Sequence, residues 1–212
     1  SRCAQLSAKA DNVVMDFSRQ LVQPETVDML FELAATADLS GKMKKMSEGV
    51  HLNSTEDRSV LHFALRCAKG SSLVVDGIDV AKDVHTVQTQ ITNFSNAVRT
   101  GEWKGCTGKP ITNIISIGIG GSYLGPEFVC QALHNDPQGA KEAAGRTLRF
   151  LANVDPVDVT RAVAGLDPET TLVCVVSKTF TTAETMMNAR TVQQWLVDGM
   201  AGQEKADIVR QH

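Results

Sequence analysis

The stretch LVCVVSKTFTTAET, residues 172–185, decides the expected fold because it joins a strand to a polar turn and then to a helix. Its first five residues are all apolar, which is typical of a strand that is covered on both faces. Residues 177–182 then place four hydroxyls and one ammonium in six positions. Thr181 and Glu184 predict a capping box that opens the helix. This combination suits a phosphate, although an ordinary Ser/Thr-rich turn would have the same composition.

Two more strand, turn and helix units precede this stretch. We expect strands at 111–117 and 148–152, with helices near 126–133 and 157–164. The helix after residue 182 carries an apolar face made by Met186, Ala189, Val192 and Leu196. Alternating units of this kind predict an α/β fold with a doubly wound parallel sheet. Because ligands bind at the carboxyl ends of such strands, the turns at 118–122 and 177–182 should lie at the same edge.

The turn at 118–122, GIGGS, is rich in glycine but matches neither common nucleotide fingerprint. A dinucleotide-binding turn would need glycine at 123, where Tyr123 stands, and an acidic residue about 20 positions later. A P-loop would need a Gly-Lys-Ser/Thr sequence, which does not follow. What remains is a turn that lets backbone N–H groups and the Ser122 hydroxyl approach a small polar ligand.

The first part of the chain predicts helices. One begins at Pro24, with Gly41 as a plausible stop, and a second covers residues 53–70, which would place Arg58 and His62 on one face. A third runs from Val80 to Val98 with unbroken apolar spacing and Asp79 as its cap. We place a boundary near Gly77, which divides a mainly helical region, 1–77, from an α/β subdomain, 78–212.

Composition limits the classes of function. The net charge is −3 and no basic block occurs, so nucleic acid and anionic membranes are not expected partners. The apolar runs are too short to span a bilayer. The five cysteines stand singly, which argues against a disulfide framework or a zinc site and favours a reducing cytoplasm. The chain begins at Ser1 without methionine, so we expect it to be a piece of a longer polypeptide.

Two long motifs carry a family resemblance. IGIGGSYLGP, residues 117–126, and SKTFTTAET, residues 177–185, resemble the paired signatures of the glucose-6-phosphate isomerase family. NSTEDRSVLHFALR, GEWKGCTGKPITNIISIGIGGS, NVDPVDV and the pair Asn188-Ala189 also match that family in order and spacing. The similarity covers nearly the whole chain, although the family's chains are considerably longer. Tyr123 stands where the family often has Asp, and Ala152 where it often has Ser.

The resemblance implies a sugar-isomerase fold and the reversible isomerisation of glucose 6-phosphate to fructose 6-phosphate through a cis-enediol, in glycolysis and gluconeogenesis. It implies no cofactor, no metal and a cytoplasmic homodimer. Ser177, Lys178, Thr179 and Thr182 would bind the phosphate, with Phe180 and Thr181 completing that substrate-binding loop. Gly121 and Ser122 would contact the sugar. The family's catalytic Glu, His, Lys and Arg come from later segments, so no catalytic residue is assigned here and the chain alone should be inactive.

Two alternatives from other classes stay open at this point. One is a sugar-phosphate-binding regulator without catalysis, built on the same subdomain, although such modules need not carry the stretch from Asn53 to Arg66. The other is a nucleotide-binding oxidoreductase domain, which Tyr123 disfavours.

Overall fold

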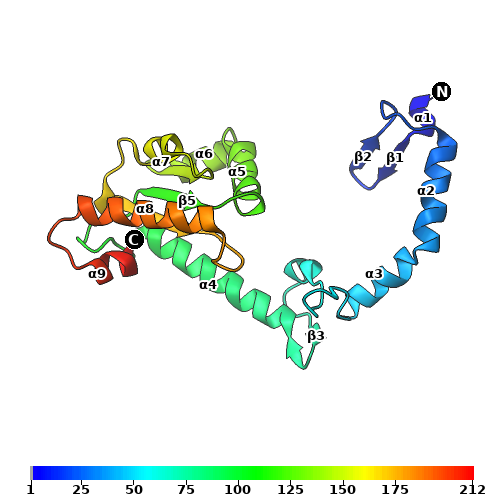
Figure 1. The fold of residues 1–212 in the computed structure, drawn as a ribbon, viewed down its shortest axis with the longest axis horizontal. Coiled ribbons are helices and arrows are strands. Elements are labelled where there is room, and N and C mark those ends of the chain that lie inside the picture. The colour runs from blue at the N-terminus through cyan, green and yellow to red at the C-terminus, as the bar shows by residue number, and fades with distance from the viewer. Residues whose placement is uncertain (1) are drawn as a thin grey trace. The chain divides into compact units, whose positions relative to one another are not determined.

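The computed structural model describes residues 2–212 and divides into two compact units, one ending at Thr89 and the other running from Gln90 to His212 (Figure 1). The long helix α4, Val80–Thr100, contributes residues to both units. Asp79 Oδ1 accepts a hydrogen bond of 3.2 Å from the backbone N–H of Lys82, which confirms the predicted cap. The predicted division at residue 77 stays a prediction.

The first unit consists of short elements. They are α1 (Arg2–Gln5), the antiparallel pair β1 (Ser7–Ala10) and β2 (Val13–Asp16), α2 (Pro24–Thr36), α3 (Leu39–Ser47), the 3-10 helix η1 (His62–Arg66), and the antiparallel pair β3 (Val74–Val75) and β4 (Ile78–Asp79). The helix predicted from Pro24 is confirmed, but its predicted stop at Gly41 is wrong, since α2 ends at Thr36 and Gly41 lies within α3.

The helix predicted over residues 53–70 is wrong. Asn53 and Arg58 form an isolated antiparallel bridge, and Asp57 adopts a left-handed conformation with φ of 47°. Thr55 Oγ1 donates to Asn53 Oδ1 at 2.8 Å, and Asn53 Nδ2 donates to Glu56 Oε2 at 2.7 Å. Such local side-chain hydrogen bonds stabilise a turn in competition with a helix. Arg58 and His62 therefore do not share one helical face, and His62 begins the short helix η1 instead.

The second unit contains the predicted parallel sheet. Its strands are β5 (Asn113–Ile117), β6 (Thr147–Leu151) and β7 (Thr171–Val175), in the order β6-β5-β7. The strands are connected by α5 (Gly121–Leu133) and α6 (Pro137–Ala143), and by α7 (Pro156–Val163) with the 3-10 helix η2 (Pro168–Thr170). After β7 come α8 (Ala183–Gly199) and α9 (Lys205–Gln211). The three predicted strands are thus confirmed within one or two residues at each end.

Helices pack on both faces of this sheet, which confirms the doubly wound architecture. On one face, α7 and α8 contribute Ala162 and Val192 to a core with Ile115, Ile117 and Leu151. On the other face, Val98 of α4 packs with Ile111 and Leu172. On that second face Tyr123 of α5 also contacts Phe150 of β6, with ring centroids 5.6 Å apart.

Strand β7 is less covered than its apolar sequence predicts. Thr171 and Leu172 are buried, but Cys174 is exposed in the described residues. On the side away from β5, the N–H of Val173 donates to the carbonyl oxygen of His212 at 2.7 Å. The expectation of a strand covered on both faces is therefore correct for its first half only.

Candidate functional site

The candidate site is fixed by the register of the three parallel strands. Ile117, the last residue of β5, pairs with Leu151 of β6 and with Val175 of β7. Just beyond these pairs, the N–H of Gly118 donates to Leu151 O at 3.2 Å and the N–H of Val176 donates to Ile117 O at 2.8 Å. Neighbouring strands lie about 4.8 Å apart, so the turns that follow β5 and β7 begin side by side. Their predicted position at one edge of the sheet is confirmed.

The glycine-rich turn needs its glycines. Gly120 has φ of 57° and ψ of −123°, a combination that side chains disfavour strongly. A Cβ atom on Gly118 would lie 3.0 Å from the carbonyl oxygen of Ser122, so the turn closes tightly. Helix α5 then begins at Gly121, five residues earlier than the sequence predicted, and encloses Pro126. Gly121 and Ser122 thereby occupy the first turn of α5, where the positive end of the helix dipole favours an anion or a polar oxygen.

The loop between β7 and α8 is organised by its own hydroxyls. The N–H of Phe180 donates to Ser177 Oγ at 3.1 Å, and Phe180 takes a left-handed φ of 54°. Thr179 Oγ1 and Thr181 Oγ1 lie 2.6 Å apart and share a hydrogen bond. These contacts order the loop directly before the N-terminus of α8, a position where anions can bind in proteins.

The predicted capping box at this helix is wrong. The N-cap of α8 is Thr182, and its side chain makes no capping hydrogen bond in the described structure. Thr181 Oγ1 is engaged with Thr179 instead of with the backbone near Glu184. The N–H groups of the first turn of α8 are thus not capped by the Thr182 hydroxyl, which suits the binding of an external anion.

Tyr123 is part of the packing around the glycine-rich turn. Its hydroxyl hydrogen-bonds Glu127, and this bond, reinforced by burial and by nearby carboxylates, raises the pKa of Tyr123. The ring packs edge to face on Phe150. Tyr123 therefore stabilises the packing of α5 on the sheet.

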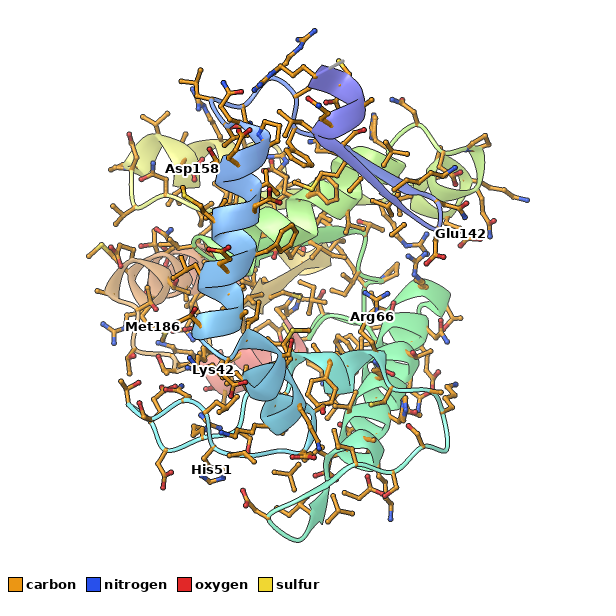
Figure 2. All side chains as sticks on the ribbon, turned by 90° about the vertical axis from the view of Figure 1, so that its right-hand side faces the viewer. Lys42, His51, Arg66, Glu142, Asp158 and Met186 are labelled. Carbon is orange, nitrogen blue, oxygen red and sulfur yellow. The ribbon has the colours of Figure 1, made fainter. Side chains whose placement is uncertain are left out.

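An open hollow lies beside the first turns of α8 and includes Met186, which is labelled in Figure 2. It has a volume of about 570 Å³ and is lined by Phe180, Thr181, Ala183, Met186, Met187, Arg190 and Thr191. The glycine-rich turn does not contribute to this lining. We therefore place the candidate site at the strand ends, on the strength of the register, and treat the hollow as a competing position that mutation can test.

A third loop lies at the same edge, and no functional role is predicted for it from the sequence. Residues 152–155 follow β6, and Asp158 Oδ2 accepts hydrogen bonds from the N–H groups of Ala152 at 3.2 Å and Asn153 at 3.0 Å. Asn188 of α8, only 2% exposed, donates from Nδ2 to Asn153 O at 2.8 Å. A polar residue on the apolar stripe of a helix is the signal that could have pointed to Asn188.

Two structural absences can be stated for residues 2–212. No group of three or more His, Cys, Asp or Glu side chains is arranged there to hold a metal ion. None of the helices in the same residues is long and apolar enough to cross a membrane.

Comparison with known proteins identifies the family. The family model described as phosphoglucose isomerase matches residues 16–212. The chain is 53% identical over 205 residues to a cytosolic glucose-6-phosphate isomerase of Zea mays, covering 97% of this chain and 36% of that protein. It is 52% identical over 211 residues to cytosolic isomerase B of Oryza sativa subsp. japonica, covering 100% of this chain and 36% of that protein. The chain therefore spans about a third of the length of the curated relatives it matches.

A solved structure agrees on the fold. The glucose-6-phosphate isomerase of Chlamydia trachomatis superposes with a TM-score of 0.74 at 24% identity, over 98% of this chain and 38% of that protein. At this identity the match supports the fold alone. Together with the family model and the plant relatives, it leads to one conclusion: this chain belongs to the phosphoglucose isomerase family.

Proposed function

We propose that this chain is the substrate-binding segment of an aldose-ketose isomerase that interconverts glucose 6-phosphate and fructose 6-phosphate in the cytosol. The observation that carries the proposal is the register of β5 and β7, which brings the glycine-rich turn and the Ser/Thr loop together. Both turns open helices, so two sets of N–H groups face the carboxyl edge of the sheet. The plant relatives that support it are named as cytosolic glucose-6-phosphate isomerases.

The two turns divide the substrate between them. Ser177, Lys178, Thr179 and Thr182 bind the phosphate, and Phe180 and Thr181 shape that loop through the contacts described above. Gly121 and Ser122 bind the sugar near its reacting end. Hydroxyls, an ammonium and helix N–H groups are all hydrogen-bond donors, which is what a phosphate dianion needs.

The reaction moves one proton between C2 and C1 of the open sugar through a cis-enediol, and a second proton moves between the oxygens of the same two carbons. This step requires an acid/base group and a cation near the developing oxyanion. We assign none of these to the described residues, and we expect the family's catalytic Glu, His, Lys and Arg to come from sequence beyond residue 212. The 212-residue chain should bind the substrate phosphate without turnover, and the full-length protein should be an active homodimer.

Steady-state kinetics of the full-length protein with fructose 6-phosphate test the roles of the two turns. Thr179→Ala or Thr182→Ala should raise KM by about 5- to 30-fold, because each removes one hydrogen bond to a charged group. Turnover should change less, because the phosphate is bound about equally in the ground and transition states. Ser122→Ala, nearer to the reacting carbons, should lower turnover more than either threonine variant.

The competing hollow beside α8 provides matched controls. Thr191→Ala removes a hydroxyl that is satisfied by Met187 O at 3.0 Å, and Arg190→Ala removes a cation of that hollow. Both should leave KM nearly unchanged. If Arg190→Ala raises KM as strongly as the threonine variants do, the phosphate binds in the hollow and the assignment to the strand ends is wrong. Turnover by the 212-residue chain alone would show that the catalytic groups have been misplaced.

A further inference from the structure

The first turns of α8 contain a buried amide that the proposed chemistry does not use. Four residues of this helix face the interior, namely Thr185, Asn188, Val192 and Leu196. Val192 and Leu196 pack in apolar clusters and hold the middle and the end of the helix. Asn188 lies one turn nearer the N-terminus and is 2% exposed, where a polar side chain costs free energy unless it is hydrogen-bonded.

The partner of Asn188 belongs to a fixed frame at the carboxyl edge of the sheet. Asn188 Nδ2 donates to Asn153 O at 2.8 Å, and Asn153 lies two residues beyond the end of β6. Asp158 of α7, labelled in Figure 2, holds that loop by accepting from the N–H groups of Ala152 and Asn153. The amide therefore connects α8 to a loop that is itself bound to α7.

The position of the hydrogen bond between Asn188 and Asn153 determines which end of α8 it holds in place. Apolar packing is weakly directional, so Val192 and Leu196 alone leave α8 some freedom to rotate or slide. A hydrogen bond has narrow limits of distance and angle and removes that freedom. Asn188 lies six residues after Thr182, the N-cap, so it acts on the end of α8 that follows the Ser177–Thr182 loop.

We propose that Asn188 is a positioning residue for the phosphate-binding loop. It holds the N-terminus of α8 in a fixed position relative to the loop that follows β6. The proposal rests on the function proposed above and adds a residue that does not touch the substrate. Because the loop's N–H groups and hydroxyls must converge on one phosphate, a small shift of α8 weakens several contacts together. Loss of the Asn188 hydrogen bond should therefore weaken substrate binding more than it lowers turnover.

The test compares two buried residues of the same helix face in the full-length protein. Asn188→Leu keeps an approximately similar volume and removes the hydrogen bond, while Val192→Ala leaves a cavity in the core beneath α8 and does not touch the bond. We expect Asn188→Leu to raise KM for fructose 6-phosphate about 3- to 10-fold with kcat within about twofold of the parent. Val192→Ala should lower the melting temperature at least as much as Asn188→Leu does, and it should leave KM near the parent value.

Several outcomes would overturn the proposal. Equal effects of the two variants on KM would mean that Asn188 matters only through stability. A fall in kcat without a change in KM would mean that the bond does not act on the phosphate. A second variant, Asn188→Ala, separates loss of the bond from strain caused by the leucine side chain, and it should raise KM in the same direction.

A binding measurement distinguishes this proposal from the proposed isomerase activity. If the parent protein does not turn over fructose 6-phosphate, the proposed function fails, and titration calorimetry with inorganic phosphate takes the place of kinetics. Weaker phosphate binding by Asn188→Leu, with normal binding by Val192→Ala, would still support the positioning role. Equal phosphate binding by all variants, or no binding by the parent, would overturn it.

Discussion

The two units of this chain have similar apolar patterns, but the apolar side chains are buried in the second unit and exposed on α2 in the first. In the second unit, apolar side chains of β5, β6, α7 and α8 meet in a buried core, and Ile115, Ile117 and Leu151 are fully buried. In the first unit, α2 has an equally clear apolar pattern but buries none of its residues. Its large apolar side chains are between 54% and 70% exposed: Met29, Leu30, Phe31 and Leu33.

The comparison teaches that periodicity predicts an element and leaves open what the element packs against. Parallel strands must be covered on both faces, so their apolar runs identify a core within the same subdomain. An amphipathic helix can instead present its stripe to any neighbouring surface. An exposed apolar helix face is a surface that calls for a covering partner, and the described residues of the first unit do not cover α2.

The strongest test of this contrast removes three carbons from each unit. Ile115→Ala should lower the free energy of unfolding by about 2 to 5 kcal/mol, because it opens a cavity in a closed core. Leu30→Ala on α2 should change it by less than about 0.5 kcal/mol in the 212-residue chain, since the leucine is already exposed. Denaturant unfolding of the two variants beside the parent gives both values. A large loss for Leu30→Ala would show that α2 is covered in solution, and the contrast between the units would disappear.

A smaller effect is expected at a directional bond that fastens a helix to the sheet in the second unit. The two N–H groups on Nη1 of Arg149 in β6 are shared among the carbonyl oxygens of Arg161, Ala162 and Ala164, which lie 2.9, 3.1 and 2.7 Å from Nη1 at the C-terminal end of α7. A cation there also complements the helix dipole. Arg149→Met should therefore reduce stability by about 1 to 2 kcal/mol, measured by thermal unfolding.

Arg161→Met is the matched control for that experiment. It removes an arginine from the same helix end, but only the backbone carbonyl of Arg161 takes part in the contact. We expect a change within about 0.5 kcal/mol. Equal losses in the two variants would attribute the effect to the general charge of this surface and would argue against the specific bonds of Arg149.

The sheet could be predicted from sequence because its signals agree with one another. The strands β5, β6 and β7 combine apolar runs with turn residues directly after them, and burial within the subdomain reinforces that local preference. The common edge of the glycine-rich turn and the Ser/Thr loop follows from the parallel order of the strands. These two features account for most of the candidate site.

The features that could not be predicted depend on which hydrogen bond a side chain selects. Thr181 could cap α8 by its spacing, but its hydroxyl binds Thr179 instead. Asn53 and Thr55 have the residue types of a helix start, yet they bond each other and form a turn. Asn188 was seen only as part of a family motif, because its acceptor, the carbonyl of Asn153, is brought close only by the fold.

The smallest effect that we predict is a pH dependence of local stability in the first unit, where a polar contact made by His51 joins two segments of the chain. His51, labelled in Figure 2, lies between two carboxylates: Nδ1 is 3.0 Å from Asp57 Oδ1 and Nε2 is 2.9 Å from Asp76 Oδ2. A carboxylate can only accept, so both bonds form together only when both ring nitrogens carry protons. The hydrogen bond that His51 donates to Asp76, followed by the one that it donates to Asp57, raises the pKa of His51 above its ordinary value of 6.5.

The sign of the effect follows from that direction. Below pH 6.5 the imidazole is protonated in both the folded and the unfolded chain, and the contact contributes fully. As the pH rises through the raised pKa of the folded state, His51 loses a proton and one of its two bonds. The contact joins the turn that contains Asp57 to the β3-β4 hairpin, which contains Asp76. Hydrogen exchange at Val75 and Ile78, corrected for its intrinsic pH dependence, should therefore increase across this interval.

Nuclear magnetic resonance titration of the His51 ring measures the cause directly. Asp76→Asn should lower the pKa of His51, and Asp57→Asn should lower it less, in the order of their contributions. Asparagine tolerates the left-handed backbone that Asp57 and Asp76 adopt, so these variants change charge with little added strain. Asp11→Asn, at another left-handed turn residue with φ of 50°, is the control and should leave the His51 titration unchanged. A His51 pKa at or below 6.5 in the parent, or one that does not respond to Asp76→Asn, would show that the two-sided contact does not form in solution.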